Sequence, residues 1–286
     1  MRFLLTALLW LLTTAALAVA LPAVWAQHNL VDADGYAAFA QRAAADPALQ
    51  EAVAAELTTQ LGDLSSSIAS PAVVNMVASH YTASSAFPGQ FAEANRLAHR
   101  WLFTNTVRSD VDPQGRWVID LTPMLSDSAF QETLSQYGIR LPDTLPVPLT
   151  QNAAEGLRPG QLQRAATWGP WASVGAAVLT GVLALLTLLA APRRGKALAA
   201  LGVSALLVGA AGWAGVEVAR RYVDNALGDT TGDIRSIANA MVGQAISSMH
   251  QWLNMSLAVG GGLVVLGVIL SLLGGLGRRS VREPAA

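Results

Sequence analysis

The sequence predicts a mainly α-helical membrane protein: a bundle of four transmembrane helices and a mostly helical extracytoplasmic domain that contains a small two-stranded element. Three observations lead to this fold class. Charged residues make up only 13% of the 286 residues, about half the usual share. The deficit is concentrated in four long apolar segments, while a polar stretch separates the first of them from the other three. Basic residues flank these segments in a pattern that sets their orientation.

The first apolar segment, residues 1–26, carries no charge after Arg2. Two interpretations stay open. Small residues ending at Ala26 fit a cleaved signal peptide, whereas a run longer than the usual 7–15 apolar residues of a signal core fits a retained anchor. A helix that spans the hydrocarbon core needs about 20 residues, which this segment supplies. We favour the anchor on its length, and in both cases the following segment is exported.

Residues 27–168 form the predicted extracytoplasmic domain, and they hold fourteen of the nineteen acidic residues. Asp46 is an expected N-cap, with Pro47 at the first helical position. Alternation in 117–121 and the prolines of 145–150 predict two extended segments that pair with each other. Apolar periodicity predicts helices within 32–64, about 68–77, about 87–103, and about 126–137 with Gly138 as its C-cap.

Three further apolar segments follow the domain. Residues 169–219 predict a transmembrane hairpin, because the PRRGK turn at 192–196 is too short for a domain. The 220–252 segment predicts an amphipathic helix that lies on the outer membrane surface or under the exported domain. Residues 253–276 supply the last span, and 277–286 form a cytoplasmic tail.

The positive-inside rule orients these spans in the cytoplasmic membrane. Seven basic residues lie in the segments assigned to the cytoplasm, where Glu283 is the one acid. Four spans with both termini inside satisfy the rule. A cleaved first segment would instead leave three spans and an external N-terminus. The seven residues are Arg2, Arg193, Arg194, Lys196, Arg278, Arg279 and Arg282.

Composition excludes several functions. A net charge of −1 and a pI near 6.4 argue against nucleic acid as a partner, which requires a basic field. The chain has no cysteine and four histidines, and no spacing suggests a zinc site, which needs three or four ligands. The usual nucleophile and phosphate-binding motifs are missing. We therefore expect neither an enzyme nor a cofactor.

Arg96, His99 and Arg100 are predicted to share one face of the helix at 87–103. The functional interpretation is a site for anionic lipid headgroups or for acidic side chains of a partner. The plainer interpretation is a solvated face whose charges pair with carboxylates of the same domain. We favour the plainer one.

Small residues on the third and fourth spans, and the stripe of the outer helix, are candidate docking residues. Close packing drives helix association in lipid, and small residues allow backbones to approach. The alternative is that both features only hold this chain's own bundle together. The candidates are Gly209, Gly212, Gly215, Gly260, Gly261, Ile237 and Met241.

Four segments of the chain resemble a family of conserved actinobacterial, mycobacterial-type integral membrane proteins. The resemblance covers about residues 29–225 and rests on NLVDADGYAAFAQRAAADPALQEAVAAELTTQL, FAEANRLAHRWL, VIDLTPML and LPVPLT. It implies a short N-terminal span, an exported domain and clustered C-terminal spans. No catalytic residue of that family carries over. A looser similarity links such proteins to accessory subunits of the mammalian-cell-entry lipid importers.

Two functions follow as expectations. The first is a non-enzymatic accessory or scaffold subunit of a cell-envelope membrane complex, with lipid transport as its candidate process. The second is an autonomous lipid-binding or transport protein. The nearly apolar spans argue against the second, because they offer a solute no polar path. The expected partners are membrane lipids and other membrane protein subunits.

Overall fold

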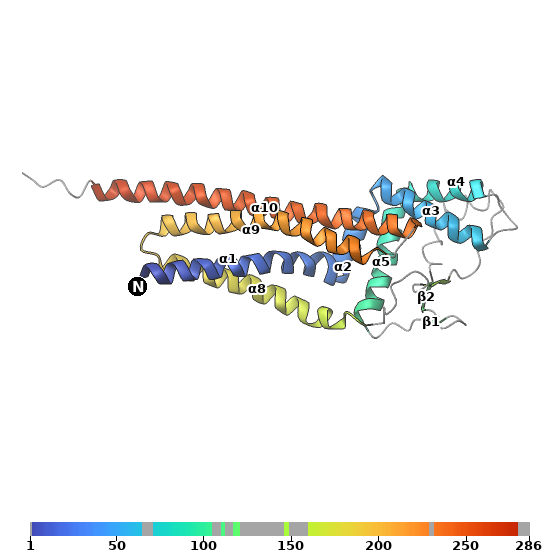
Figure 1. Ribbon diagram of the computed structural model, residues 1–286, viewed down its shortest axis with the longest axis horizontal. Helices are drawn as coiled ribbons and strands as arrows, with labels where there is room; N and C mark the ends of the chain where they lie inside the picture. The colour runs from blue at the N-terminus through green and yellow to red at the C-terminus, as the bar shows by residue number, and fades with distance from the viewer. Residues whose placement is uncertain are drawn as a thin grey trace, which may run out of the picture. The chain divides into compact units, whose positions relative to one another are not determined.

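The computed structural model describes residues 2–64, 71–104, 110–111, 117–120, 146–148, 160–228 and 232–279. Most of these residues are helical (Figure 1). Among them, four helices are long and apolar enough to cross a membrane, which confirms a mainly α protein with four candidate spans. The chain divides into a bundle unit (1–27, 169–221 and 246–286) and a domain unit (28–168 and 222–245).

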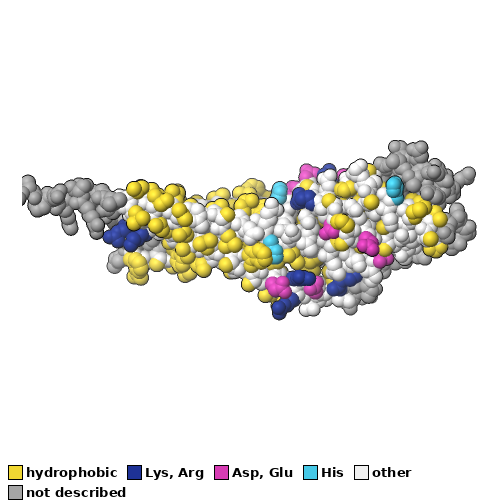
Figure 2. Space-filling view, turned by 90° about the horizontal axis from the view of Figure 1, so that it is seen from above, with side chains coloured by type: hydrophobic (Ala, Val, Ile, Leu, Met, Phe, Trp, Pro, Cys, Tyr) yellow, Lys and Arg dark blue, Asp and Glu magenta, His cyan; other side chains and the backbone are white. Residues whose placement is uncertain are grey.

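The four candidate spans contribute the helices of the bundle unit. These segments are helical because lipid offers no hydrogen-bond partner to the backbone, so each segment must satisfy its own N–H and C=O groups. Their leucine and valine side chains stay largely exposed, and Figure 2 shows them in yellow along this unit. The helices are α1 (Arg2–Ala26), α8 (Gln163–Ala190), α9 (Arg194–Ala226) and α10 (Gly232–Arg279).

The last helix differs from the expectation. We predicted an outer helix within 220–252 and a separate span at 253–276, whereas α10 runs unbroken for 48 residues. At 1.5 Å per residue this is about 72 Å, far more than the roughly 20 residues that a span requires. No proline interrupts α10, and Gly260, Gly261 and Gly262 lie inside an apolar stretch where a helix break would leave backbone groups unsatisfied.

Hydroxyl and indole groups tie α1 to two other helices of the bundle unit. The indole Nε1 of Trp10 donates to the carbonyl of Ala200 at 2.8 Å, and the hydroxyls of Thr14 and Ser204 are 2.7 Å apart. The hydroxyls of Thr13 and Thr187, both buried, lie 3.3 Å apart. Thus α1 contacts α9 through two polar links and α8 through a third.

The domain unit is built mainly from four helices: α2 (Ala33–Ala43), α3 (Pro47–Leu64), α4 (Pro71–Thr82) and α5 (Phe87–Phe103). A π-helical turn, η1 (Gln27–Val31), joins α1 to this set. The predicted start of α3 is confirmed: its first residue is Pro47, and a carboxylate oxygen of Asp46 accepts the N–H of Ala48 at 2.9 Å.

Aromatic and aliphatic side chains from several helices form the core of the domain unit. Phe87 and Leu49 are fully buried, and Tyr81 meets the ring of Phe87 edge-on at 5.6 Å. Val77 belongs to the same cluster, and Met241 of α10 packs against it. The first part of α10 is therefore a structural element of this domain.

Three short strands belong to the domain unit, whereas the sequence predicted two. They are β1 (Asp110–Val111), β2 (Trp117–Asp120) and β3 (Pro146–Pro148), in the order β1-β2-β3 and antiparallel throughout. Ile119 pairs with Val147. The helix expected at about 126–137, with its cap at Gly138, lies outside the described residues.

Candidate functional site

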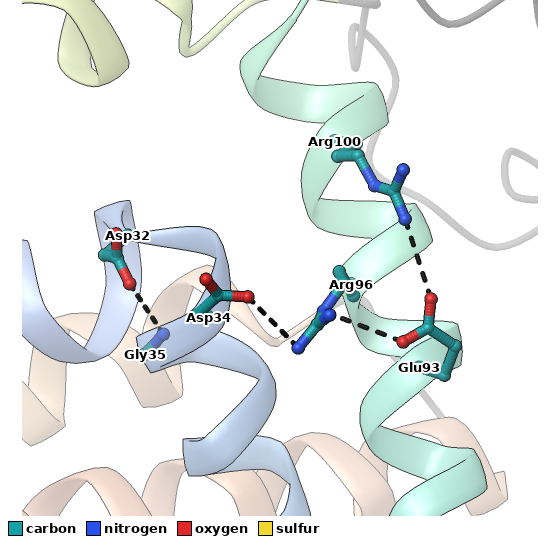
Figure 3. A network of polar contacts seen from close by, with 6 residues as sticks. All are labelled: Asp32, Asp34, Gly35, Glu93, Arg96 and Arg100. Carbon is teal, nitrogen blue, oxygen red and sulfur yellow. Dashed lines mark hydrogen bonds and ion pairs between the residues drawn. The ribbon is translucent and has the colours of Figure 1, made fainter.

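The basic face predicted on α5 is divided by the structure into two arginines and a buried histidine. Arg96 reaches Asp34 of α2 at 3.1 Å and Glu93 at 3.6 Å, and Arg100 reaches Glu93 at 3.6 Å (Figure 3). These side chains are partly exposed, so each pair contributes little to stability. The arrangement matches the plainer interpretation, in which the domain's own carboxylates neutralise the face.

The turn between η1 and α2 positions Asp34 for this network. The carboxylate of Asp32 accepts the backbone N–H of Gly35 at 2.7 Å and so caps α2 (Figure 3), which satisfies one of the free donors at the helix start. A Cβ at Gly35 would collide with the carbonyl oxygen of His28. Only glycine allows the backbone to approach this closely.

His99 lies on the inner side of α5 and is 5% exposed. Its Nε2 lies 3.0 Å from the carbonyl oxygen of Leu30, so Nε2 carries the proton and donates it, because a carbonyl can only accept. The imidazole stacks on Phe103 with centroids 4.0 Å apart and 7° between the planes. Tyr36 lies on it at 5.2 Å.

The second ring nitrogen of His99 is in a different situation. Its Nδ1 is buried and has no hydrogen-bond partner among the residues that the structure describes. Burial lowers the pKa of His99, against the opposing effects of hydrogen bonds to the backbone of Leu30 and Val31 and of the nearby charge of Asp32. The imidazole is therefore held as its neutral Nε2–H tautomer.

Tyr36 closes the same cluster. Its hydroxyl donates to the side-chain oxygen of Asn95 at 3.3 Å, and the amide of Asn95 in turn donates to the carbonyl of Phe91 at 2.9 Å. Burial raises the pKa of Tyr36. The cluster is a fixed, neutral, mostly aromatic contact between α2, α5 and η1.

No metal site is found within the described part of the chain, where no three His, Asp or Glu side chains come together. Two of the four histidines, His80 and His99, lie on the successive helices α4 and α5. His80 is exposed on α4, whereas His99 is buried against η1.

The glycines proposed for docking fall into two groups. Added side chains at Gly209 and Gly212 would meet Leu257 and Leu253 of α10, and one at Gly260 would meet the backbone of α9. These three glycines lie in the contact between α9 and α10. This favours the alternative that they hold this chain's own bundle together. Within 4 Å of a Cβ at Gly215 or Gly261, by contrast, no described atom lies.

Part of the apolar stripe that contains Ile237 and Met241 is covered by residues of the same chain. Met241 packs against the core cluster of the domain unit, together with Ala240, and Ile237 is half-buried. The domain therefore covers at least the Met241 part of the stripe, without a lipid or a second subunit.

The α9–α10 contact has a regular spacing that was not among the sequence-based expectations. Gly195, Gly202 and Gly209 are seven residues apart on α9. A methyl group added at each of them would contact α10, and the contacted residues lie progressively nearer the start of α10. A seven-residue repeat keeps one face turned to the partner helix. The facing positions on α10 alternate in steps of four and three: Leu253, Leu257, Gly260, Val264, Gly267 and Ser271. This spacing was readable from the sequence.

Comparison with known proteins adds nothing to this geometry. The chain matches no protein-family model, no curated protein and no solved structure. What the molecule does must be inferred from its own surfaces. These are an internal seam between α9 and α10, a neutral cluster around His99, and the apolar faces of the bundle unit that no described residue covers.

Proposed function

We propose that the protein is a non-enzymatic accessory or scaffold subunit of a cell-envelope membrane complex, anchored in the cytoplasmic membrane with its domain unit on the extracytoplasmic side. Lipid transport is the candidate process of that complex. The spans support a structural role, because α8 carries no charge after Arg164 and α9 carries none between Lys196 and Glu217. Intramembrane charges mark most ion and solute pathways.

The observation that carries the proposal is one open face of α8. Val174, Val178, Leu185 and Leu189 are 59%, 59%, 56% and 64% exposed, and their spacing of four or seven residues places them on one side of the helix. Gly181 lies between Val178 and Leu185 on that side, with no described atom within 4 Å of a built Cβ. A gap in an apolar ridge is suited to a large side chain from a partner helix.

The proposed docking helix is α8, whereas the sequence suggested candidates on the third and fourth spans and on the outer helix, which are parts of α9 and α10. Since Gly209, Gly212 and Gly260 are used within the chain, their substitution should disturb the protein itself. Substitution at Gly181 should leave the monomer intact and weaken only an external contact. The two classes of glycine thus separate a docking role from a folding role.

The test is recovery of partners with the tagged full-length protein in mild detergent. We expect other membrane subunits to co-purify with the wild type, and Gly181→Leu to reduce their recovery at unchanged abundance. Gly212→Leu is the matched control, with reduced abundance of the protein itself. A lone monomer that crosslinks to nothing in cells would refute the scaffold role. Recovery of lipid without protein would favour the autonomous lipid-binding protein.

A further inference from the structure

The contact between His99 and η1 links two segments that lie far apart in the sequence. The carbonyl of Leu30 belongs to the π-helical turn that follows α1, and His99 lies on the fourth turn of α5, 69 residues later. One hydrogen bond of 3.0 Å joins them. The flat stack on Phe103 holds the ring in the orientation that this bond needs.

Protonation of the imidazole would change this contact. A second proton would sit on Nδ1, which is buried and lacks an acceptor among the described residues. A buried charge that is not hydrogen-bonded is costly, whereas in water the imidazolium is fully solvated. The protonated ring therefore favours any conformation in which it leaves the stack.

The carboxylates near His99 already have other partners, so they are not available to stabilise a positive charge on its ring. Asp34 is held by Arg96 at 3.1 Å, and Glu93 lies 3.6 Å from both Arg96 and Arg100. Asp32 attracts the imidazolium, but its carboxylate already accepts the N–H of Gly35.

The remaining titratable groups are basic or neutral. Tyr36, which covers the ring, is neutral because burial raises its pKa. On α2, Arg42 donates to the buried side chain of Asn29 at 3.3 Å. His28 of η1 and Arg164 near the start of α8 are the other basic groups of the adjoining elements.

We propose that His99 is a pH-sensitive latch, which holds α5 to η1 while its imidazole is neutral and releases η1 when the imidazole is protonated. At neutral pH the latch fixes the turn that leads from the first apolar helix into the domain. Acidification loosens that turn while the core around Phe87 and Leu49, which contains no histidine, stays packed. The latch operates whether or not the chain binds a partner.

The direction of the pH dependence follows from the lowered pKa of His99. In the released state the imidazole titrates near its ordinary value of 6.5. Above that pH the imidazole is neutral in both the closed and the released state. Opening of the latch is then independent of pH, and the latch stays closed. As pH falls below 6.5 toward the lower pKa of the closed state, the released state gains a proton. Opening then rises by at most about tenfold per pH unit.

The experiment uses the full-length chain in detergent micelles with labelled histidine side chains. The chain has four histidines, and His99→Gln identifies the ring signal that belongs to position 99. We expect this signal to titrate below pH 6.5. A midpoint at or above 6.5 would overturn the latch, and this result does not depend on whether any variant folds.

Hydrogen exchange measures the release itself. After correction for intrinsic exchange, protection of the amides in 28–36 should fall between pH 7 and pH 5.5 in the wild type. In His99→Gln, whose amide can still donate to Leu30 but does not titrate, this protection should be independent of pH. His80→Gln, at an exposed position of α4, is the matched control and should behave as the wild type. An equal fall in the wild type and in His99→Gln would refute the proposal.

Discussion

Gly35 shows how one residue sets a junction in this protein. The backbone of η1 lies so close to the start of α2 that a methyl group at position 35 would overlap the carbonyl oxygen of His28. The side chain of Asp32 caps α2 at the same place. The close approach and the cap together define the junction between η1 and α2.

The first prediction compares this glycine with another in the same domain. Gly35→Ala should lower the stability of the domain by about 1–3 kcal/mol, as expected when a group is forced into filled space. Gly89→Ala, on α5 with no described atom within 4 Å of a Cβ, should raise stability by about 0.5–1 kcal/mol because alanine restricts the unfolded chain. Thermal unfolding of the purified full-length variants measures both. Equal effects of the two changes would contradict the model of the junction.

Single residues also show which features could be predicted from the sequence. The cap at Asp46 was predictable because it depends on neighbours two residues away. The burial of His99 was not, because its helical spacing from Arg96 and Arg100 suggests one common face, while the group that buries it, the η1 backbone, is distant in sequence. Local chemistry was readable, and long-range contact was not.

At the scale of elements, the seam between α9 and α10 depends on glycine at regular positions. A Cβ at Gly202 would come within 2.6 Å of the carbonyl oxygen of Gly260 and 2.7 Å of the backbone nitrogen of Val264. Both neighbours are backbone atoms, which cannot move aside as a side chain can. The two helices therefore approach closely because their contact positions are small.

The second prediction tests this seam. Gly202→Leu should separate α9 from α10 and lower the amount of folded protein in the membrane, with a cost of about 1–3 kcal/mol or more. Gly215→Leu lies on the same helix at an open position, so it should accumulate like the wild type. Membrane abundance and protease resistance give the comparison. Normal accumulation of Gly202→Leu would show that the seam is not needed.

The third prediction concerns the link between α1 and α9. The hydroxyls of Thr14 and Ser204 lie 2.7 Å apart, and either of them can be the donor. Each hydroxyl can also donate to a carbonyl of its own helix, Thr14 to Trp10 at 2.9 Å and Ser204 to Ala200 at 3.3 Å. Thr14→Val and Ser204→Ala should therefore show a coupling of about 0.6 kcal/mol, the average for such bonds in membranes. A double-mutant cycle on unfolding in detergent measures it, and strictly additive effects would disprove the link.

The elements also show why the end of the chain was misread. The change from an amphipathic to an apolar pattern near residue 252 predicts a boundary between two helices. Composition changes where a helix enters lipid, but the backbone hydrogen bonds need not break there, and α10 continues from Gly232 to Arg279. Hydropathy predicts the surroundings of a helix better than its ends.

For the whole molecule, the number of candidate spans was readable from the sequence, because it depends on the long-range distribution of apolar and charged residues and not on individual contacts. Four helices of sufficient length and hydropathy are found among the described residues. The orientation of these helices stays a prediction. An even number of spans would put both termini on one side, and the excess of basic residues in the assigned inner segments predicts that this side is the cytoplasm.

The last prediction is that residues 1–26 stay in the mature protein as the first of these four spans. A signal peptide is removed and so has no lasting partner, whereas α1 meets α8 at Thr187 and α9 at Ser204 and Ala200. Its loss would leave the hydroxyl groups of Thr187 and Ser204 facing lipid. Intact-mass measurement should find residues 1–26 present, and reporter fusions after residue 60, at residue 195 and at the C-terminus should read outside, inside and inside. A mature chain that begins at Gln27, or a fusion at 195 that reads outside, would contradict the four-span topology.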